Sequence, residues 1–259
     1  MKELLLVKDF SVYYDSLIVD NVSLTLHENE LVGLIGHNGC GKSTMLKGIM
    51  GSLKHSGTVT VENRDFMTMQ MKQRAQNIAM LTQRIEVVEG ISAGELIGLG
   101  SYPYLQLNQK INIKKVQQIA KSLQIESLLN KDYSILSEGQ KQLVQIARII
   151  MQDTLVLLLD EPDSALDFDN RCMMFKILQR LIKFKRKSAL IVLHNPLYAL
   201  MYCDRVLLMD KGKIISEIKP QLESCEEITK KIQLIYSNVI IKKDDEYQQY
   251  YYLTRGSVK

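Results

Sequence analysis

The stretch "GHNGCGKST", residues 36–44, decides the fold. It matches the pattern G-x-x-x-x-G-K-[ST], it follows the strand-like run "LVGLIG", and it opens a helical pattern that extends to residue 50. The backbone N–H groups of such a turn can surround a triphosphate, the amine of Lys42 can reach the β and γ phosphates, and the hydroxyl of Ser43 can bind magnesium. The sequence therefore predicts a strand, loop and helix unit that binds a nucleoside triphosphate.

Two carboxylates at a strand end supply a second part of this chemistry. The run "LVLLLDEP" (155–162) is apolar up to Asp160 and Glu161, and Pro162 ends it. Asp160 suits magnesium coordination, usually through water, and Glu161 could orient or deprotonate an attacking water. Adjacent acids at a strand end are usually solvated turn residues, but the phosphate-binding turn upstream favours the catalytic interpretation.

The apolar patterns along the chain predict an α/β fold. Residues 3–35 hold three strand-like segments, and "TLVLLLD" (154–160) and "SALIVLH" (188–194) are continuous apolar runs separated by a helical pattern. Such runs are expected of parallel strands that are buried on both faces. Residues 84–150 are mainly helical in pattern, and residues 237–253 alternate as a terminal hairpin would.

The composition is that of a globular chain without a membrane span. Its 259 residues are 46% hydrophobic, enough for a large buried core, and no stretch approaches the ~20 apolar residues of a spanning helix. The net charge of +4, from 33 basic and 29 acidic residues, gives no indication of nucleic-acid binding. The four cysteines lack the spacing of a zinc site, and the N-terminal run carries charges that argue against a signal peptide. We therefore expect a cytosolic protein.

The segment "LSEGQ" (136–140) has the features of a helix start. Ser137 and Gln140 form a capping-box pattern, and an apolar face follows in the next residues. A helix start is a natural place for an anion, and Gly139 permits close approach of the backbone. A phosphate there would be repelled by Glu138 unless that side chain pointed aside. The segment alone therefore leaves the presence of an anion open.

Four motifs together resemble the ATP-binding subunit of ABC transporters: "GHNGCGKST", "LSEGQ", "LLLDEPDSALD" (157–167) and a lone histidine, His194, after a strand. They stand in that family's order and spacing, and the resemblance covers residues 3–220. It implies a P-loop NTPase of the ABC ATPase type, an α/β fold with a RecA-like core, an antiparallel β-subdomain and a helical subdomain. It also implies one ABC ATPase domain over residues 1–259, with the helical subdomain inserted at about 84–150 and a C-terminal helix and hairpin at 221–259.

The resemblance also assigns roles to individual residues. Tyr13, with Tyr14 as the nearby alternative, matches an aromatic residue that stacks on adenine. Gln83 in "MLTQ" matches a glutamine that contacts magnesium, the attacking water and the membrane partner, and His194 matches a histidine that contacts the γ-phosphate. The expected catalytic residues are thus Glu161, His194 and Gln83, and the expected ligands of Mg²⁺, bound together with ATP, are Ser43, Gln83 and Asp160. The other expected nucleotide contacts form the phosphate-binding turn, in which His37 and Cys40 fill variable positions: Gly36, His37, Asn38, Gly39, Cys40, Gly41, Lys42, Ser43 and Thr44.

In this family the LSGGQ segment completes the nucleotide site of a second copy. The resemblance therefore implies a dimer, formed on ATP binding about a two-fold axis, that encloses two ATP molecules. In that dimer the residues that bind the partner's nucleotide are Ser137, Gly139 and Gln140, and those at the interface are Ser164, Ala165, Leu166 and Asp167. A homodimer is the simplest form, and a heterodimer with a second ATPase stays open.

Three residues depart from the family's usual pattern. Glu138 replaces the middle glycine of the family's LSGGQ segment, which is called the signature and corresponds to residues 136–140. If the Glu138 side chain points to solvent, the site is intact; if it points inward, ATP-driven closure is weakened. We favour the orientation toward solvent. Asp163 stands where threonine is common, and Asn195 follows His194 where aspartate is usual. Asp163 and Asn195 leave the catalytic set intact.

The leading hypothesis is the ATPase of an importer, peripheral on the cytoplasmic side of the membrane. Its expected partners are two integral-membrane permease subunits and an extracytoplasmic substrate-binding protein, with no nucleic acid. The alternatives are an importer or exporter for another substrate, or a soluble ABC ATPase that does not transport. An exporter normally carries its own span, and soluble repair or translation factors carry a long coiled-coil insertion or two cassettes. The segment "ISAGELIGLGSYPYL" (91–105) is similar to that of ATPases for iron-siderophore, haem and cobalamin uptake, which predicts a substrate of this type.

Overall fold

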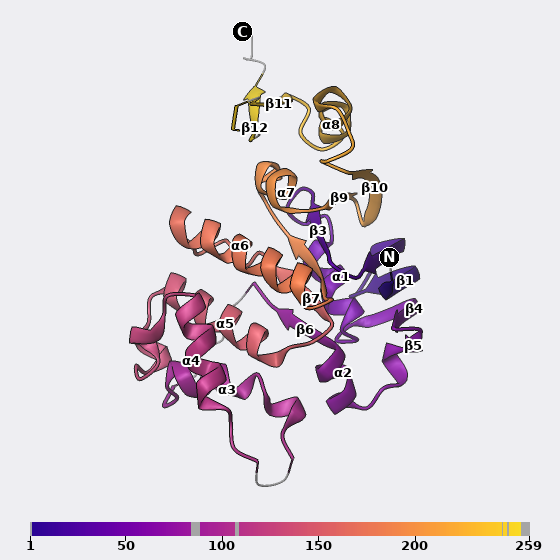
Figure 1. Cartoon of the computed structure of the whole chain (residues 1–259). Coiled ribbons are helices and arrows are strands. Elements are labelled where there is room, and N and C mark those ends of the chain that lie inside the picture. The colour runs from indigo at the N-terminus through magenta and orange to yellow at the C-terminus, as the bar shows by residue number, and fades with distance from the viewer. Residues whose placement is uncertain (1, 84–88, 107–108, 245, 248, 255–259) are drawn as a thin grey trace.

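The computed structural model of the chain describes residues 2–83, 89–106, 109–244, 246–247 and 249–254 (Figure 1). Residues 84–88, with which the predicted helical subdomain begins, lie outside the described residues, as do residues 245, 248 and 255–259 of the predicted C-terminal unit. None of the helices in the described part combines the length and the apolar composition that crossing a membrane would require.

The described elements alternate between strands and helices. The strands are β1 (Glu3–Tyr13), β2 (Leu17–His27), β3 (Glu30–Ile35), β4 (Lys54–Val61), β5 (Arg64–Asp65), β6 (Ile78–Leu81), β7 (Val156–Asp160), β8 (Ser188–Val192), β9 (Arg205–Asp210), β10 (Lys213–Ile218), β11 (Val239–Lys243) and β12 (Tyr250–Thr254). The α-helices are α1 (Lys42–Ile49), α2 (Met71–Asn77), α3 (Ala93–Leu99), α4 (Ile113–Ser122), α5 (Glu138–Gln152), α6 (Phe168–Phe184), α7 (Pro196–Tyr202) and α8 (Cys225–Ile232).

A six-stranded sheet forms the centre of the molecule. Its strand order is β10-β9-β3-β8-β7-β6, and every neighbouring pair is parallel except the edge pair of β10 and β9. Because parallel strands begin at one edge of a sheet and end at the other, the loops that follow β3, β6, β7 and β8 leave from the same edge. This sheet confirms the predicted α/β class.

Two apolar cores lie against opposite faces of this sheet. Successive residues of β7 alternate between them, with Val156 and Leu158 in one core and Leu157 and Leu159 in the other. The first core also holds α1 and the strands of the antiparallel sheet β2-β1-β4-β5, and the second holds residues of α3 to α8. Burial on both faces explains the continuous apolar runs that the sequence shows at β7 and β8.

Figure 1 shows three groups of elements around the central sheet. The antiparallel strands β1, β4 and β5 lie on one side, the helices α3 and α4 lie below, and α8 with the hairpin of β11 and β12 lies at the top. The C-terminal unit is tied to the core, since the hydroxyl of Tyr250 donates to the Pro220 carbonyl at 2.6 Å. The signature segment opens α5, which packs against α3 and α4.

The start of β3, the strand that leads to the phosphate-binding turn, is held by a charged network. The Arg205 guanidinium donates to Glu30 from Nε at 2.8 Å and from Nη2 at 3.1 Å, and Nη1 donates to Glu217 at 3.0 Å. The side chains of Arg205 and Glu30 are only 13% and 11% exposed. Since a bidentate pair at this depth satisfies both charges, removing one partner leaves the other buried and uncompensated.

We expect Arg205→Met to lower the free energy of unfolding by about 3 kcal/mol, because the Glu30 carboxylate would lose its cation. The matched control is Lys213→Met, which breaks an ion pair to Asp20 whose side chains are 61% and 39% exposed. That loss should stay below about 1 kcal/mol. Urea denaturation followed by circular dichroism measures both, and equal losses in the two variants would contradict the argument.

Candidate active site

The turn between β3 and α1 needs glycine at two positions. A Cβ atom on Gly36 would lie 2.2 Å from the Met209 carbonyl oxygen on β9, which no side chain can accept. Gly41 precedes α1 with φ of +110°, a conformation that L-residues with side chains rarely adopt. The turn is thus packed closely against the neighbouring strand β9 where it leads into α1.

Lys42 and Ser43 open α1 beneath this turn. The Lys42 amine is buried and donates to the carbonyl oxygens of Gly36 and His37, each at 2.9 Å. The Ser43 hydroxyl donates to Oδ1 of Asp160, at the end of β7, at 2.9 Å. A cation and a hydroxyl are therefore fixed side by side at the start of a helix, where an anion is already favoured by the dipole.

Asp160 is held in a low-polarity position. It is 1% exposed, and burial raises the pKa of its carboxyl, while the Ser43 hydrogen bond opposes that rise. The negative charge of Glu161 raises the pKa further, and the amines of Lys47 and Lys42 lower it. A carboxylate in this environment gains from a neighbouring cation, which is the situation of a magnesium ligand.

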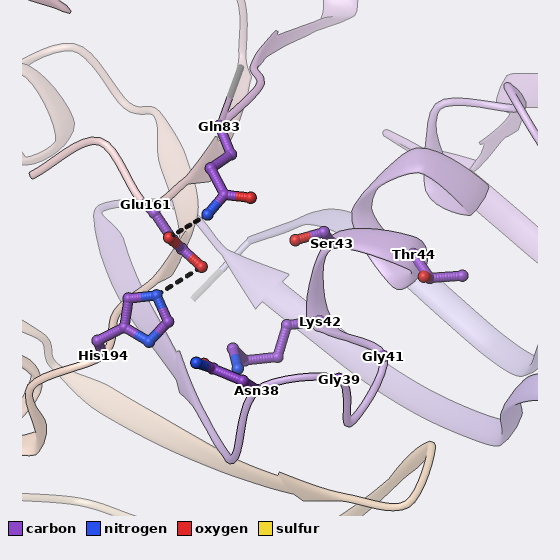
Figure 2. A pocket seen from close by; sticks show the side chains of 9 residues that line it. All are labelled: Asn38, Gly39, Gly41, Lys42, Ser43, Thr44, Gln83, Glu161 and His194. Atoms are coloured by element: carbon purple, nitrogen blue, oxygen red, sulfur yellow. Dashed lines mark hydrogen bonds and ion pairs between the residues drawn. The ribbon is translucent and has the colours of Figure 1, made fainter. Parts of the chain in front are cut away.

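Glu161 follows β7 in the left-handed region, with φ of +52°. Its carboxylate lies between two side chains from other loops: Nε2 of Gln83 donates to Oε2 at 2.6 Å, and Nε2 of His194 lies 2.6 Å from Oε1 (Figure 2). A glutamate in this conformation costs about 1 to 3 kcal/mol and persists only where its surroundings impose it. The strained backbone and the two short contacts define one orientation for this carboxylate.

These residues line one cavity of about 250 Å³, with Lys42 and Ser43 on one side and Gln83, Glu161 and His194 on the other (Figure 2). Its lining is Asn38, Gly39, Gly41, Lys42, Ser43, Thr44, Gln83, Glu161 and His194. All nine were predicted from the sequence, and they come from four separate segments of the chain: the phosphate-binding turn with the start of α1, and the ends that follow β6, β7 and β8.

The donor set fits a magnesium ion bound together with phosphate. In the part of the chain that the structure describes, no cluster of three or more His, Cys, Asp or Glu side chains could hold a metal ion by itself. Ser43 and Gln83 line the cavity and offer a hydroxyl and an amide oxygen. The predicted ligand Asp160 is not among the described lining residues, but its carboxylate oxygen lies 2.9 Å from the Ser43 hydroxyl. Hard oxygen ligands in small number are typical of magnesium that is shared with a substrate's phosphates.

Several predicted residues lie outside the described lining of the cavity. Gly36 and Cys40 are buried in the turn, and Tyr13 is half-buried at the end of β1. The His37 ring is exposed and meets the edge of the Tyr236 ring, with centroids 5.5 Å apart. Sequence reasoning missed Tyr236, because it lies in the C-terminal unit and belongs to no motif.

The signature residues likewise do not line this chain's own cavity. Ser137 caps α5 by accepting from the Gln140 N–H at 3.3 Å, and the Gln140 side chain accepts from the Ser137 N–H at 3.1 Å. Glu138 is 69% exposed and receives a hydrogen bond from Lys141 at 3.0 Å. Its side chain therefore points to solvent, which is the orientation that the sequence analysis favoured.

The segment of Ser164, Ala165, Leu166 and Asp167 lies beside the start of α5. A Cβ atom on Gly139 would lie 2.9 Å from the Ala165 carbonyl oxygen, and Gln142 donates to the Pro162 carbonyl at 2.9 Å. Asp167 caps α6 by accepting from the Asn170 N–H at 2.9 Å. The two predicted interface motifs are thus neighbours within one chain.

Comparisons with known proteins agree with this geometry. The family model described as "ABC transporter" matches residues 19–164. The chain is 35% identical over 211 residues to the "Hemin import ATP-binding protein HmuV" of Escherichia coli O157:H7, which covers 79% of this chain and 81% of that protein. It is 30% identical over 213 residues to the "Petrobactin import ATP-binding protein FpuD" of Bacillus anthracis, covering 81% of this chain and 78% of that protein.

A solved structure described as the "Dimeric structure of a post-hydrolysis state of the ATP-binding cassette MJ0796 bound to ADP and Pi" superposes with a TM-score of 0.77. It is 25% identical in sequence and covers 84% of this chain and 99% of its own. These matches confirm the fold class that the sequence predicted.

Glu161→Gln should keep ATP binding and remove most of the hydrolysis. The amide still fits between Gln83 and His194 but cannot accept a proton, so kcat should fall by roughly 100-fold or more. Lys42→Ala should instead lose nucleotide affinity, which separates the two roles. Fluorescent-nucleotide titration and phosphate release measure them. Hydrolysis at the wild-type rate in Glu161→Gln would refute the role of this carboxylate.

Asp160→Asn should raise the melting temperature of the nucleotide-free protein while removing magnesium-dependent hydrolysis. The amide keeps an oxygen for Ser43 and carries no buried charge. Below the pKa of an unfolded aspartate both proteins are neutral at this position, so the gain is smallest there. As the pH rises through the raised pKa of Asp160, the wild type loses stability and the gain of the variant grows.

Thermal melts from about pH 3 to about pH 8 begin below the pKa of an unfolded aspartate, which is about 3.9. A variant that melts below the wild type throughout would show that the Asp160 charge stabilises the empty site.

Proposed function

The chain belongs to the ABC transporter family, and from that premise we propose that it is the ATP-hydrolysing subunit of a multi-subunit importer for haem or a ferric siderophore. The proposal of ATP hydrolysis rests on the position of the Glu161 carboxylate. It is held between Gln83 and His194, across the cavity from Lys42 and Ser43. The observation that carries the substrate part is the identity of 35% and 30% with proteins named for import of hemin and petrobactin.

ATP would bind with its phosphates in the turn between β3 and α1. The Lys42 amine now donates to two main-chain carbonyls, and phosphate oxygens are stronger acceptors because they carry charge. Ser43, Asp160 and Gln83 would hold magnesium, which when bound neutralises charge on the phosphate oxygens. Tyr13 would stack on the adenine from the end of β1.

Hydrolysis requires a water that is aligned with the γ-phosphate and loses a proton as it attacks. Glu161 is the base in this proposal, because its carboxylate faces the cavity in a single fixed orientation. Gln83 and His194 keep that orientation through their 2.6 Å contacts, one to each carboxylate oxygen. We propose that His194 also contacts the γ-phosphate from the same side.

A second copy of the chain would complete each site. Ser137, Gly139 and Gln140 stand at a helix start that does not line the described cavity of their own chain, which supports a role toward the nucleotide of a partner. The exposed orientation of Glu138 keeps its charge aside from such a nucleotide. We propose a homodimer that forms on ATP binding, with residues 164–167 at its interface.

The membrane partners follow from the function of an importer ATPase. We propose that the dimer lies on the cytoplasmic side of the membrane beneath two permease subunits, and that an extracytoplasmic binding protein delivers the substrate. Coupling would run through Gln83 and residues of the insert at 84–135, because ATP can shift the permease only through contacts that differ between its states.

Deleting the gene should abolish uptake of hemin or of a ⁵⁵Fe-labelled siderophore and leave sugar uptake unchanged. Wild-type protein should restore that uptake, and Glu161→Gln, which folds and binds ATP but lacks the base, should not. Normal uptake of both iron compounds with loss of sugar uptake would refute the substrate class and leave the ATPase assignment standing. Co-purification with ribosomes or DNA and with no permease would refute transport.

A further inference from the structure

Arg171, near the start of α6, donates hydrogen bonds from both terminal nitrogens of its guanidinium to groups outside its own helix, while its buried Nε donates no hydrogen bond. Nη2 donates to the Leu166 carbonyl at 2.8 Å and to the Asp163 carbonyl at 3.3 Å. Nη1 donates to the Tyr198 hydroxyl at 3.2 Å, and the guanidinium carbon lies 5.2 Å from the centre of the Tyr198 ring. One side chain therefore joins the segment after Glu161 to helix α7.

Asp163 completes this arrangement with a buried charge. Its carboxylate lies 3.4 Å from Nε of Arg171, and the side chains are 12% and 24% exposed. Burial raises the pKa of Asp163, while the charge of Arg171 opposes that rise. This is the acid that departs from the family's usual threonine, and a threonine could not form an ion pair with a guanidinium.

Tyr198 connects Arg171 to helix α7, which begins two residues after His194. Asn195 follows His194 and caps α7, accepting from the Leu197 N–H at 2.9 Å. The Tyr198 ring stacks on Phe175 of α6 at 5.8 Å, and Phe175 stacks in turn on Tyr202 at 4.3 Å. The first turn of α7 is thus clamped to α6 on the side where Arg171 lies.

We propose that Arg171 is a positioning residue for ATP hydrolysis, which ties residues 163–167 to α7 so that the two segments move as one body. The proposal rests on the proposed function, in which residues 164–167 meet a second copy and His194 orients Glu161. Docking of the second copy would then fix His194 through Arg171, and hydrolysis would depend on a residue that touches neither ATP nor the reacting water.

The test compares Arg171→Gln with Arg171→Lys and with a control on the same helix, Arg180→Gln, whose side chain is exposed. In Arg171→Gln the affinity for a fluorescent ATP analogue should stay within about twofold while kcat falls roughly 10- to 100-fold, the loss expected when a catalytic group is misplaced. Arg171→Lys keeps the cation but not the planar fork, so it should recover only part of the rate. Arg180→Gln should match the wild type.

A double variant separates positioning from simple charge neutralisation. Arg171→Gln leaves a buried carboxylate unpaired, and adding Asp163→Thr removes that charge. The double variant should regain the melting temperature of the wild type and stay slow. Recovery of the wild-type kcat in the double variant, or an unchanged kcat in Arg171→Gln, would overturn the proposal.

The histidine NMR signals of the nucleotide-free protein test the link without any hydrolysis. The chain has four histidines, so the His194 imidazole signal can be assigned by its loss in His194→Gln. That signal should shift in Arg171→Gln and stay in place in Arg180→Gln. If the wild type failed to hydrolyse ATP, the proposed function would fall, while this shift would still decide whether Arg171 positions His194; an unshifted signal would refute the link.

Discussion

The parallel pairing of β6, β7, β8 and β3 is the constraint on which the whole site depends. In this register Leu81 lies beside Leu159, and Ile191 lies beside both Leu159 and Gly33. The phosphate-binding turn, Gln83, Glu161 and His194 follow these strands, so one sheet edge assembles a site from segments far apart in sequence. Burial of both faces fixes that register, because a slip by one residue would exchange the two cores.

Buried acidic side chains at this sheet edge lower the stability of the nucleotide-free protein, but their charge is available to a bound cation. Asp160, Glu161 and Asp163 are all buried residues, and this burial raises the pKa of Asp160 and of Asp163. Each acid is stabilised differently: Asp160 by a hydroxyl, Glu161 by an amide and an imidazole, and Asp163 by a guanidinium. A bound cation would offset the free-energy cost of burying the Asp160 charge. The folded protein is therefore less stable at the position where catalysis would gain from a preorganised charge.

Local patterns predicted the chemistry better than they predicted the contacts. The turn residues, Asp160, Glu161 and the capping box of Ser137 and Gln140 could be read from adjacent residues, because each depends on the backbone within one turn or strand end. The contacts of Tyr236 with His37 and of Arg171 with Tyr198 could not, since they depend on how distant elements pack. The short helices α2 and α7 also escaped prediction, because seven residues carry too little periodicity. The division of the chain into a core, a helical insert and a C-terminal unit stays a prediction.

The separation of the signature residues 136–140 from the cavity supports the proposal that one chain by itself is an incomplete enzyme. The start of α5 carries the dipole and glycine that suit a phosphate, yet within its own chain Ser137 and Gln140 bond to each other and Gly139 lies against Ala165. A single copy would thus contact only one side of ATP, with Lys42, the phosphate-binding turn and Glu161. In the proposed dimer, binding energy from a second helix start would be available only in the closed state, so nucleotide and partner would favour the same state. Because that gain would exist only with ATP bound, hydrolysis would remove it and let the proposed dimer open.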